Sequence, residues 1–442
     1  MRGTPAELAF ARHYAASRAL LETREPAWLG RLRAEAFEAF EARGLPTTKH
    51  EDWRFTSLAK LERLELETAD SRAGATPVAL PADSRVALGP AHRLVFVNGR
   101  YAPSLSAVGP LPAGCRVAPL AAVLERDAGS VERVFASAAD AKTRPFVALN
   151  TALFGDGAFV ELAAGAALDR PVHALFLQTG AGSPVVAHPR TLVSAGRDSR
   201  ALVVEQHGGD TRAPDVTNAV TEIRVERGAA LDHVLVQDLP ASSFGFSAIL
   251  ARQDAQSRLG LHSIALGAAL ARVELECRLE GEGAELGMNG LYLGRGTQHS
   301  DQHTTIDHAA PRTTSRELFK GILDERAHGV FHGRIHVRPD AQKINADQTN
   351  RALLLSDRAT INSKPQLEIY ADDVKCSHGA TIGQLDAAQL FYLRARGLDL
   401  ETARALLTLA FASEVLERLP LEALRVSLEN ALLGWLPLGG RS

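Results

Sequence analysis

The sequence predicts a mainly β protein, with an elongated solenoid at its centre and helical segments at both ends. Three observations support this fold class. From about residue 150, apolar and polar residues alternate as they do in half-buried strands. A short turn-like motif recurs there at nearly constant spacing, which indicates a structural repeat. The residues before this region and after Gly383 instead show helical periodicity and helix-capping residues.

The N-terminal segment is predicted to be helical. Thr4 can cap a helix that opens with Pro5, and a glutamate three residues after the cap completes a capping box. A second helix is expected from Pro26 to about Gly44, because its apolar residues recur at helical spacing. We assign these helices to a helical or mixed domain spanning residues 1–145.

The central region is predicted to be a β-helix core spanning residues 146–383. Its clearest strand is Val273–Glu280, in which every second residue is apolar. The turn-like motif ends in leucine, and its copies begin at Gly165, Ser199, Gly228, Gln256 and Gly283. Successive copies are 34, 29, 28 and 27 residues apart, and Asp357 begins a later degenerate copy.

The repeats favour a solenoid over other β architectures. No helix in this region is long enough for a βαβ crossover, which argues against a Rossmann sheet. A β-sandwich or jelly roll is the alternative, but its turn signals would recur every 8 to 12 residues or so without a longer period. We therefore favour stacked coils of a β-helix.

The C-terminal residues 384–442 are predicted to form a helical domain. One helix is expected from about Asp386 to Arg396, followed by Gly397 as its stop residue; Asp399 caps a second, and Pro420 opens a third. The second helix carries a set of apolar residues predicted to form one stripe: Ala403, Leu406, Leu407, Ala410, Phe411, Val415 and Leu416. This cluster of helices could cap the open end of the solenoid or dock a partner.

Composition and motifs exclude several functional classes. A formal net charge of -3 over 442 residues, without blocks of like charge, predicts neither a nucleic-acid groove nor a polybasic membrane patch. The three cysteines have no CxxC spacing, which excludes a disulfide framework and fits a reducing compartment. The phosphate-loop, dinucleotide and nucleophile-elbow motifs are absent from the sequence.

The location expected from the sequence is cytoplasmic. The N-terminal residues lack the apolar region of a signal peptide. No apolar run approaches the roughly 18 residues that a membrane-spanning helix needs. We therefore expect no membrane span.

Six of the 15 histidines raise the question of a metal site: His299, His303, His308, His328, His332 and His336. On a strand, His332 and His336 would share one face but lie about 13 Å apart, too far for one ion. His303 and His308 would point to opposite faces. We favour a structural or solvated role, and ligation across neighbouring coils is the remaining route. A metal-dependent enzyme on a β-solenoid or jelly roll is therefore kept as an alternative function.

Cys376 and His378 form a more specific candidate site. Two residues apart on a strand, they point to one face with Cα atoms about 6 to 7 Å apart, so both could reach one metal or cluster. They supply only half of a ligand set. Cys277 is expected to be a buried hydrophobic residue, and Cys115 is expected to be a loop thiol.

The stretch KCSHGATIGQLDAAQLFYLRARGLDLETARALLTLAFASEVLERLP, at 375–420, closely resembles the C-terminal signature of the SufB/SufD family, on the SufD side. Further stretches are similar to the same family: 44–58, 94–106, 148–162 and 303–356. The resemblance covers nearly the whole chain. The SufD side is indicated because Cys376 and His378 occur together.

The resemblance implies a fold and a set of partners. It implies a right-handed parallel β-helix between helical domains, which pairs with SufB and docks the ATPase SufC through the C-terminal helices. The chain would be a non-catalytic scaffold of the SufBCD complex for iron–sulfur cluster assembly. It would bind no cofactor alone and would share a transient iron–sulfur cluster with SufB.

The resemblance also implies roles for individual residues. Cys376 and His378 match the motif near the SufB interface where a cluster is thought to assemble, and His378 is the stronger candidate of the two. Leu406, Ala410 and Phe411 mark the expected SufC-docking region. Direct ligation by the cysteine–histidine pair, a flavin shared by the complex, the stoichiometry and the roles of the histidines at 299–336 are left open.

Overall fold

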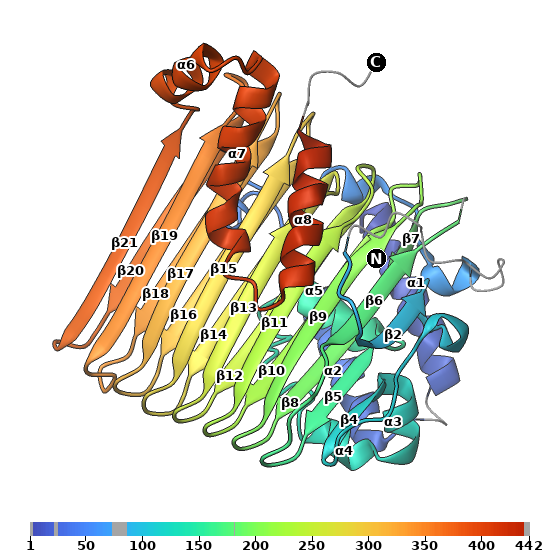
Figure 1. The fold of residues 1–442 in the computed structure, drawn as a ribbon. Helices are drawn as coiled ribbons and strands as arrows, with labels where there is room; N and C mark the ends of the chain where they lie inside the picture. The colour runs from blue at the N-terminus through green and yellow to red at the C-terminus, as the bar shows by residue number, and fades with distance from the viewer. Residues whose placement is uncertain (1–2, 22–24, 73–85, 181, 437–442) are drawn as a thin grey trace.

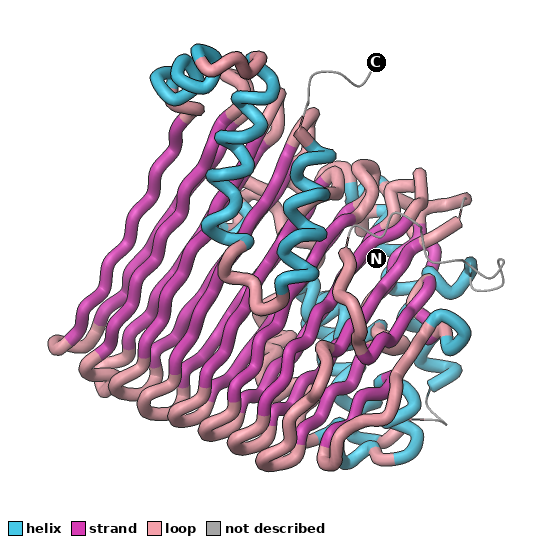
Figure 2. The backbone as a smooth tube through the Cα atoms, in the orientation of Figure 1, coloured by secondary structure: helices cyan, strands magenta, loops and turns pink. Residues whose placement is uncertain are grey.

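The computed structural model describes residues 3–21, 25–72, 86–180 and 182–436. It is mainly β, as predicted, and its core is a flattened solenoid of about eight turns (Figures 1 and 2). Two long sheets of mostly parallel strands face each other, and each coil contributes one strand to each sheet. The solenoid predicted from the repeat is confirmed.

The two sheets are named A and B here. Sheet A contains, in spatial order, β20 (Thr360–Ile369), β18 (His328–Val337), β16 (His299–His308), β14 (Leu270–Leu279), β12 (Phe244–Gln253), β10 (Val216–Val225), β8 (Arg190–Ala195), β5 (Ala158–Leu162) and β4 (Cys115–Pro119), with β7 (Val185–Ala187) and β1 (Glu67–Thr68) at its side. Sheet B contains β21 (Val374–Gly383), β19 (Ile344–Leu354), β17 (Thr314–Leu323), β15 (Glu285–Gly294), β13 (Arg258–Ala265), β11 (Ala230–Asp238), β9 (Arg200–Gly209), β6 (Val172–Gln178), β2 (His92–Val97) and β3 (Arg100–Tyr101).

The register of the coils explains the period seen in the sequence. Neighbouring strands are paired residue to residue, as in Val216 with Phe244 and Phe244 with Leu270. Because the pairing continues over whole strands, side chains at equivalent positions stack in columns along the solenoid. In the predicted strand, now β14, Val273, Leu275 and Cys277 belong to the core between the sheets.

The turns from sheet A to sheet B stack on one another. Gly165, Gly228 and Gly283 adopt positive φ at these turns, as do Asp198 and Gln256. Each of these residues donates its backbone N–H to a carbonyl of the next coil, as Gly228 does to Ala255 at 3.1 Å. The turn motif is therefore a ladder of left-handed turn residues.

The later copy of the motif was placed wrongly. Asp357 lies in the connection from β19 to β20, which runs from sheet B to sheet A at the opposite edge. The missing members of the ladder are Arg312 and Lys343, which have positive φ but no glycine or leucine signal. Cys115 was also misjudged, because it is the first residue of β4 and not part of a loop.

The N-terminal helices cover the outer face of sheet A. They are α1 (Pro5–Leu21), α2 (Ala27–Arg43), α3 (Leu120–Arg126), α4 (Ala128–Glu132) and α5 (Pro145–Leu153), with short 3-10 segments η1 (Glu51–Trp53), η2 (Leu61–Arg63) and η3 (Ala69–Arg72). A fourth 3-10 segment, η4 (Pro103–Leu105), packs instead against β2 of sheet B. The predicted capping box is present, because Glu7 accepts from the N–H of Thr4 and Thr4 accepts from that of Glu7. The apolar face of these helices packs on Val216, Phe244 and Phe246 of sheet A.

A buried ion pair ties these helices to the sheet. The side chains of Arg190 on β8 and Glu222 on β10 are fully buried and paired. Glu222 also accepts backbone N–H groups of Ala136 and Ala138, and Arg190 donates to Asn150 of α5. The polar groups of this junction are therefore largely satisfied within the protein.

The C-terminal helices are α6 (Ala387–Ala395), α7 (Leu400–Leu416) and α8 (Glu422–Trp435). Asp399 caps α7 as predicted, and Asp386 caps α6 near the predicted start of that helix. Figure 1 shows α7 and α8 lying across the strands of sheet B, where Leu416 and Leu428 belong to a core cluster with Ile322. α7 and α8 therefore cover a face of the solenoid and do not cap its end. Only α6 lies near the last coil, beside the end of β21 (Figure 1).

The predicted apolar stripe of α7 is divided between two faces. Val415 and Leu416 are buried against sheet B, whereas Leu406 and Ala410 are exposed. The buried face is completed by Ala405 and other small residues. The single stripe was wrong because apolar residues of this helix extend around more than the packed face.

Candidate functional site

The last coil of the solenoid is open. β20 pairs only with β18, and β21 pairs only with β19, so neither has an outer strand neighbour within the described residues. Large apolar side chains are exposed here, with Tyr370 at 62% and Ile382 at 53%. Unpaired edges and exposed apolar side chains together are typical of a surface that another chain covers.

Cys376 and His378 lie on β21 at this open end. They align with Ala346 and Gln348 of β19, which belong to the inward-facing column of that strand. Cys376 packs partly against the interior core, whereas His378 is exposed. The strand therefore presents both side chains at the mouth of the space between the sheets.

The environment of Cys376 favours the thiol over the thiolate. Burial raises the pKa of the Cys376 side chain above its ordinary value. Iron binds the thiolate, so a bound metal would have to displace this proton. The described chain alone thus offers an incomplete and only partly activated ligand set.

A polar column beneath His378 was missed by sequence reasoning. Gln348 lies under His378 in the register of sheet B, and its Nε2 donates to Oε2 of Glu317 at 2.7 Å. Glu317 is enclosed between the sheets, and burial raises its pKa to about 7. The three residues are about 30 positions apart in the chain, so only the coil register reveals the column.

A second exposed apolar surface lies on α6 and the first half of α7. Phe391 is 75% exposed and Leu406 is 43% exposed. Ala410 is also exposed, whereas Phe411 is half-buried under the ammonium group of Lys320, 4.4 Å from the ring centroid. Of the three predicted docking residues, two face outward and one is held against sheet B.

Five of the six clustered histidines lie on the outer face of sheet A. His299 stacks on His328 of the next coil, and His303 stacks on His332, with ring centroids 4.8 and 4.9 Å apart. His308 is buried and contacts the hydroxyl groups of Thr313 and Ser315. The expectation that His303 and His308 face opposite ways is confirmed.

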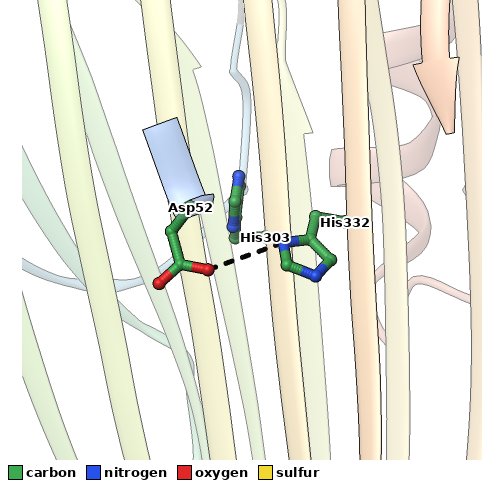
Figure 3. A group of neighbouring side chains, drawn as sticks. All are labelled: Asp52, His303 and His332. Carbon is green, nitrogen blue, oxygen red and sulfur yellow. Dashed lines mark ion pairs between the residues drawn. The ribbon is translucent and has the colours of Figure 1, made fainter. Parts of the chain in front are cut away.

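Residues 51–56, which include η1, reach over these histidines. Asp52 of η1 lies beside His303 and His332 (Figure 3), and Trp53 covers the guanidinium of Arg272 at 3.9 Å. The hydroxyl group of Thr56 donates to Asp301. The oxygen of this hydroxyl group can therefore accept from Nε2 of His299, 2.8 Å away. The N-terminal segment is thereby docked onto β14 and β16.

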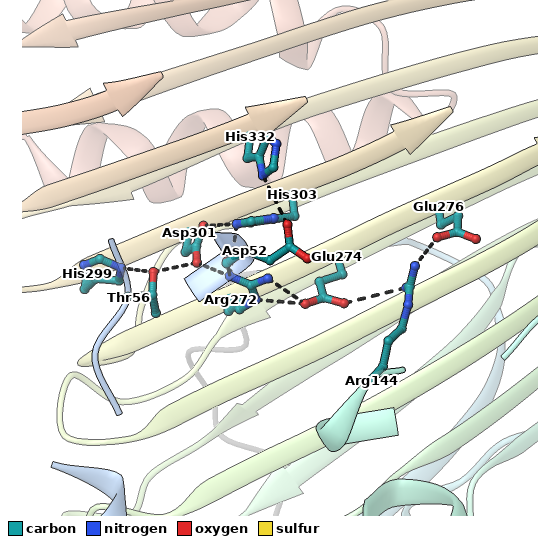
Figure 4. Close-up of polar contacts among 10 residues, drawn as sticks. All are labelled: Asp52, Thr56, Arg144, Arg272, Glu274, Glu276, His299, Asp301, His303 and His332. Carbon is teal, nitrogen blue, oxygen red and sulfur yellow. Dashed lines mark hydrogen bonds and ion pairs between the residues drawn. The ribbon is translucent and has the colours of Figure 1, made fainter. Parts of the chain in front are cut away.

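A buried charge network lies under this segment (Figure 4). Arg272 pairs with Asp301 at 2.5 Å and with Glu274 at 2.8 Å. Although burial favours the neutral acid, His303 and Arg272 hold the pKa of Asp301 well below its ordinary value. Burial lowers the pKa of His299 to about 4, so this imidazole is neutral at physiological pH.

Comparisons with known proteins agree with the geometry. The family model described as "SUF system FeS cluster assembly, SufBD core domain" matches residues 176–411, and "SufBD protein N-terminal region" matches residues 4–174. An iron–sulfur cluster assembly SufBD family protein of Synechocystis is 35% identical over 398 residues, covering 88% of this chain and 87% of the relative.

Two relatives carry a more specific name. The iron–sulfur cluster assembly protein SufD of Escherichia coli is 33% identical over 405 residues, covering 90% of this chain and 91% of the relative. SufD of Bacillus subtilis is 26% identical over 423 residues, covering 92% and 94%. Separately, no helix among the described residues is long and apolar enough to cross a membrane.

Proposed function

Since this chain belongs to the SufBD family of iron–sulfur cluster assembly proteins, we propose that it is a SufD-type scaffold subunit without catalytic activity of its own. Family membership implies a role in iron–sulfur cluster assembly. In this proposal the chain belongs to a SufBCD complex, pairs with SufB and is moved by the ATPase SufC. The open end of the solenoid, with Cys376 and His378 at its mouth, carries the proposal.

SufB is the proposed partner of the open end. β20 and β21 offer unpaired backbone groups at the edges of two sheets, and a second β-helix could continue both ladders. Tyr370 and Ile382 would be buried in such an interface. This supports pairing of two solenoids end to end.

The proposed SufC-docking surface is formed by α6 and the outward face of α7. Phe391, Leu406 and Ala410 are exposed there. The opposite face of α7 is fixed on sheet B, partly through the ion pair of Lys320 with Glu414 at 2.6 Å. A partner that moves this surface would therefore pull on the solenoid itself.

We propose that the cluster is a cargo shared with SufB and not a resident cofactor of this chain. A thiolate and an imidazole are soft and borderline ligands that suit iron, but two ligands do not complete a site. Burial raises the pKa of Cys376, so ligation of iron by this thiol requires the loss of its proton. His378 is exposed at the open end and accessible to a partner, so it remains the stronger candidate.

Co-expression with SufB and SufC tests the proposed interface. Replacing Ile382 by Asp puts a charge in the apolar open end, so we expect SufB to be lost while SufC still co-purifies. The mass of the purified complex measures this. Leu8→Asp, at an exposed position of α1 far from the open end, is the matched control. Undiminished recovery of SufB with Ile382→Asp would contradict the proposal.

The alternative of a metal-dependent enzyme on the histidine cluster has less support. The histidines at 299 and 328 are engaged by Thr56 and Asn362, and His336 contacts Asp307. Two relatives that are 33% and 35% identical are named for iron–sulfur cluster assembly and not for a reaction. The cytoplasmic location expected from the sequence stays a prediction.

A further inference from the structure

We propose that Asp52, His303 and His332 form a binding site for one divalent transition-metal ion of the Zn²⁺ or Fe²⁺ class, located between the N-terminal segment and sheet A (Figure 3). The site is independent of the scaffold function proposed above. It lies on the outer face of sheet A, whereas Cys376 and His378 lie on β21 of sheet B.

The coil register brings two of the ligands together. His303 and His332 are direct partners in the pairing of β16 with β18, so the strand ladder fixes their spacing. The carboxylate of Asp52 comes from η1, and its Oδ1 lies 3.9 Å from Nδ1 of His332. One donor atom from each of the three residues lies within 4.8 Å of the other two.

Only a small adjustment would complete this arrangement. Zinc lies about 2.0 to 2.2 Å from imidazole nitrogen and carboxylate oxygen, so donors around one ion are roughly 3 to 3.5 Å apart. Asp52 is the residue that can close the gap, because its side chain is 70% exposed. Two imidazoles and one carboxylate form a common donor set for Zn²⁺ and for non-heme Fe²⁺.

The surrounding residues prepare the histidines for metal binding. Nε2 of His303 lies 2.9 Å from Oδ1 of Asp301 and accepts from the guanidinium of Arg272 at 3.0 Å, so the buried charge network fixes the orientation of this ring. Nε2 of His332 is buried and has no hydrogen-bond partner among the described residues. Its Nδ1 is beyond hydrogen-bond distance from Asp52. His332 therefore keeps one buried nitrogen without a hydrogen-bond partner in the described part of the chain, whereas Nε2 of His299, of His303 and of His328 has one.

The polar network beside the site contains charges of both signs. Of the residues drawn in Figure 4, two are guanidiniums (Arg144 and Arg272) and four are carboxylates: Asp52, Glu274, Glu276 and Asp301. Arg334 and Lys364 also line the cavities beside the site. The donor atoms, and not a net negative charge, therefore carry the case for a cation.

There is also room for water ligands. A cavity of about 110 Å³ adjoins the site, and Asp52, His303, His332 and Glu276 are among the residues that line it. That volume holds several water molecules, since each needs roughly 10 to 15 Å³ of space accessible to its centre. Three protein ligands and waters are typical of a site with open coordination positions.

The neighbouring histidine pair provides a matched comparison. His299 and His328 stack across the same two strands at nearly the same distance. Their nitrogens are engaged by Thr56 and Asn362, and no carboxylate group joins them as a third donor among the described residues. Replacing His328 therefore changes a stacked histidine without removing a proposed ligand.

The test uses the full-length untagged chain, stripped with a chelator and titrated with Zn²⁺ by calorimetry, with bound metal measured by elemental analysis. We expect about one ion per chain. Asp52→Asn and His332→Asn should each weaken binding by at least about tenfold, because each removes one of three protein ligands. His328→Asn and the double variant Cys376→Ala with His378→Ala should bind as the parent does.

A structural readout separates this site from binding elsewhere. The ion would link η1 to sheet A, so Zn²⁺ should slow amide hydrogen exchange in residues 51–56 of the parent but not of Asp52→Asn. Undiminished affinity in Asp52→Asn and His332→Asn would overturn the proposal. So would loss of binding confined to the Cys376 and His378 variant, or an equal loss in His328→Asn.

Discussion

Glu317 is a carboxylic acid enclosed between the sheets, and its protonation couples stability to pH. An unfolded glutamate ionises near pH 4.5, whereas burial raises the pKa of Glu317 to about 7. Between these values the unfolded state binds fewer protons, so the free energy of unfolding falls as pH rises and levels off above pH 7. The full effect is roughly 3 kcal/mol.

We expect Glu317→Gln to remove this decrease in the free energy of unfolding at higher pH. The variant should match the parent near pH 4.5 and be more stable at pH 8, because the amide stays neutral and can still accept from Gln348. Urea denaturation of both chains across this range measures the difference. Glu285→Gln, at the exposed first residue of β15, is the control. A parallel pH dependence of the parent and Glu317→Gln would contradict the buried-acid interpretation.

The buried pair of Arg190 and Glu222 predicts a large mutational effect. Glu222→Gln leaves a fully buried guanidinium without its counter-charge, so we expect a loss of about 3 to 5 kcal/mol in unfolding free energy. Chemical denaturation measures this loss. Arg312→Ala disrupts the exposed pair with Glu282 and should change stability by less than about 0.5 kcal/mol. Similar effects from both changes would show that burial does not determine the cost.

At the scale of the turns, two glycines in equivalent positions differ in their surroundings. Gly228 and Gly283 both have φ of +71°. A Cβ at Gly228 would lie 2.1 Å from Oδ1 of Asp198, whereas at Gly283 the nearest atom would be Cγ of Gln256 at 3.9 Å. Both substitutions by alanine incur left-handed strain of about 1 to 2 kcal/mol, but only one adds a clash.

We therefore expect Gly228→Ala to be more destabilising than Gly283→Ala, by about 1 kcal/mol. The two variants can be compared by urea denaturation under identical conditions. Equal losses would mean that the Asp198 side chain moves aside without cost. Asp198 itself has positive φ, so Asp198→Gly should be stabilising by relief of the same strain.

At the scale of strands, turns and helices, the sequence predicted the features that depend on local signals and missed those that depend on tertiary packing. Alternation along 273–280 and the Gly228-type turns predicted the strands and the period, because both signals are local. Arg312 and Lys343 occupy the same turn position without a glycine, so local chemistry could not identify them. The division of the α7 stripe depended on which side of the helix meets sheet B, which is a tertiary property.

The candidate site could be predicted only in part. Cys376 and His378 are two residues apart, so their shared face followed from strand geometry. Gln348, Glu317 and the Asp52–His303–His332 group are assembled by coil register and by docking of the N-terminal segment. The coil period in the sequence gives only the approximate spacing of these residues and not which side chains meet, and the docking of Asp52 onto a strand 251 positions later leaves no periodic trace.

At the scale of the whole molecule, the two partner surfaces should be separable. Leu406→Asp places a charge on the exposed face of α7, so we expect loss of SufC capture with SufB pairing intact. Co-purification with both partners measures this. Leu8→Asp again serves as the exposed control. Retention of SufC by a folded Leu406→Asp protein would place the docking surface elsewhere.

The open last coil also has a mechanical consequence. β21 is bonded along one side only, and α6 follows it after three residues, so a force applied to α6 would detach that strand one hydrogen bond at a time. α7 and α8 spread the same load over interior coils whose strands are bonded on both sides. Among the described strands, the last coil should therefore yield to such a force more easily than the interior coils do. Cys376 and His378 lie on its strand β21.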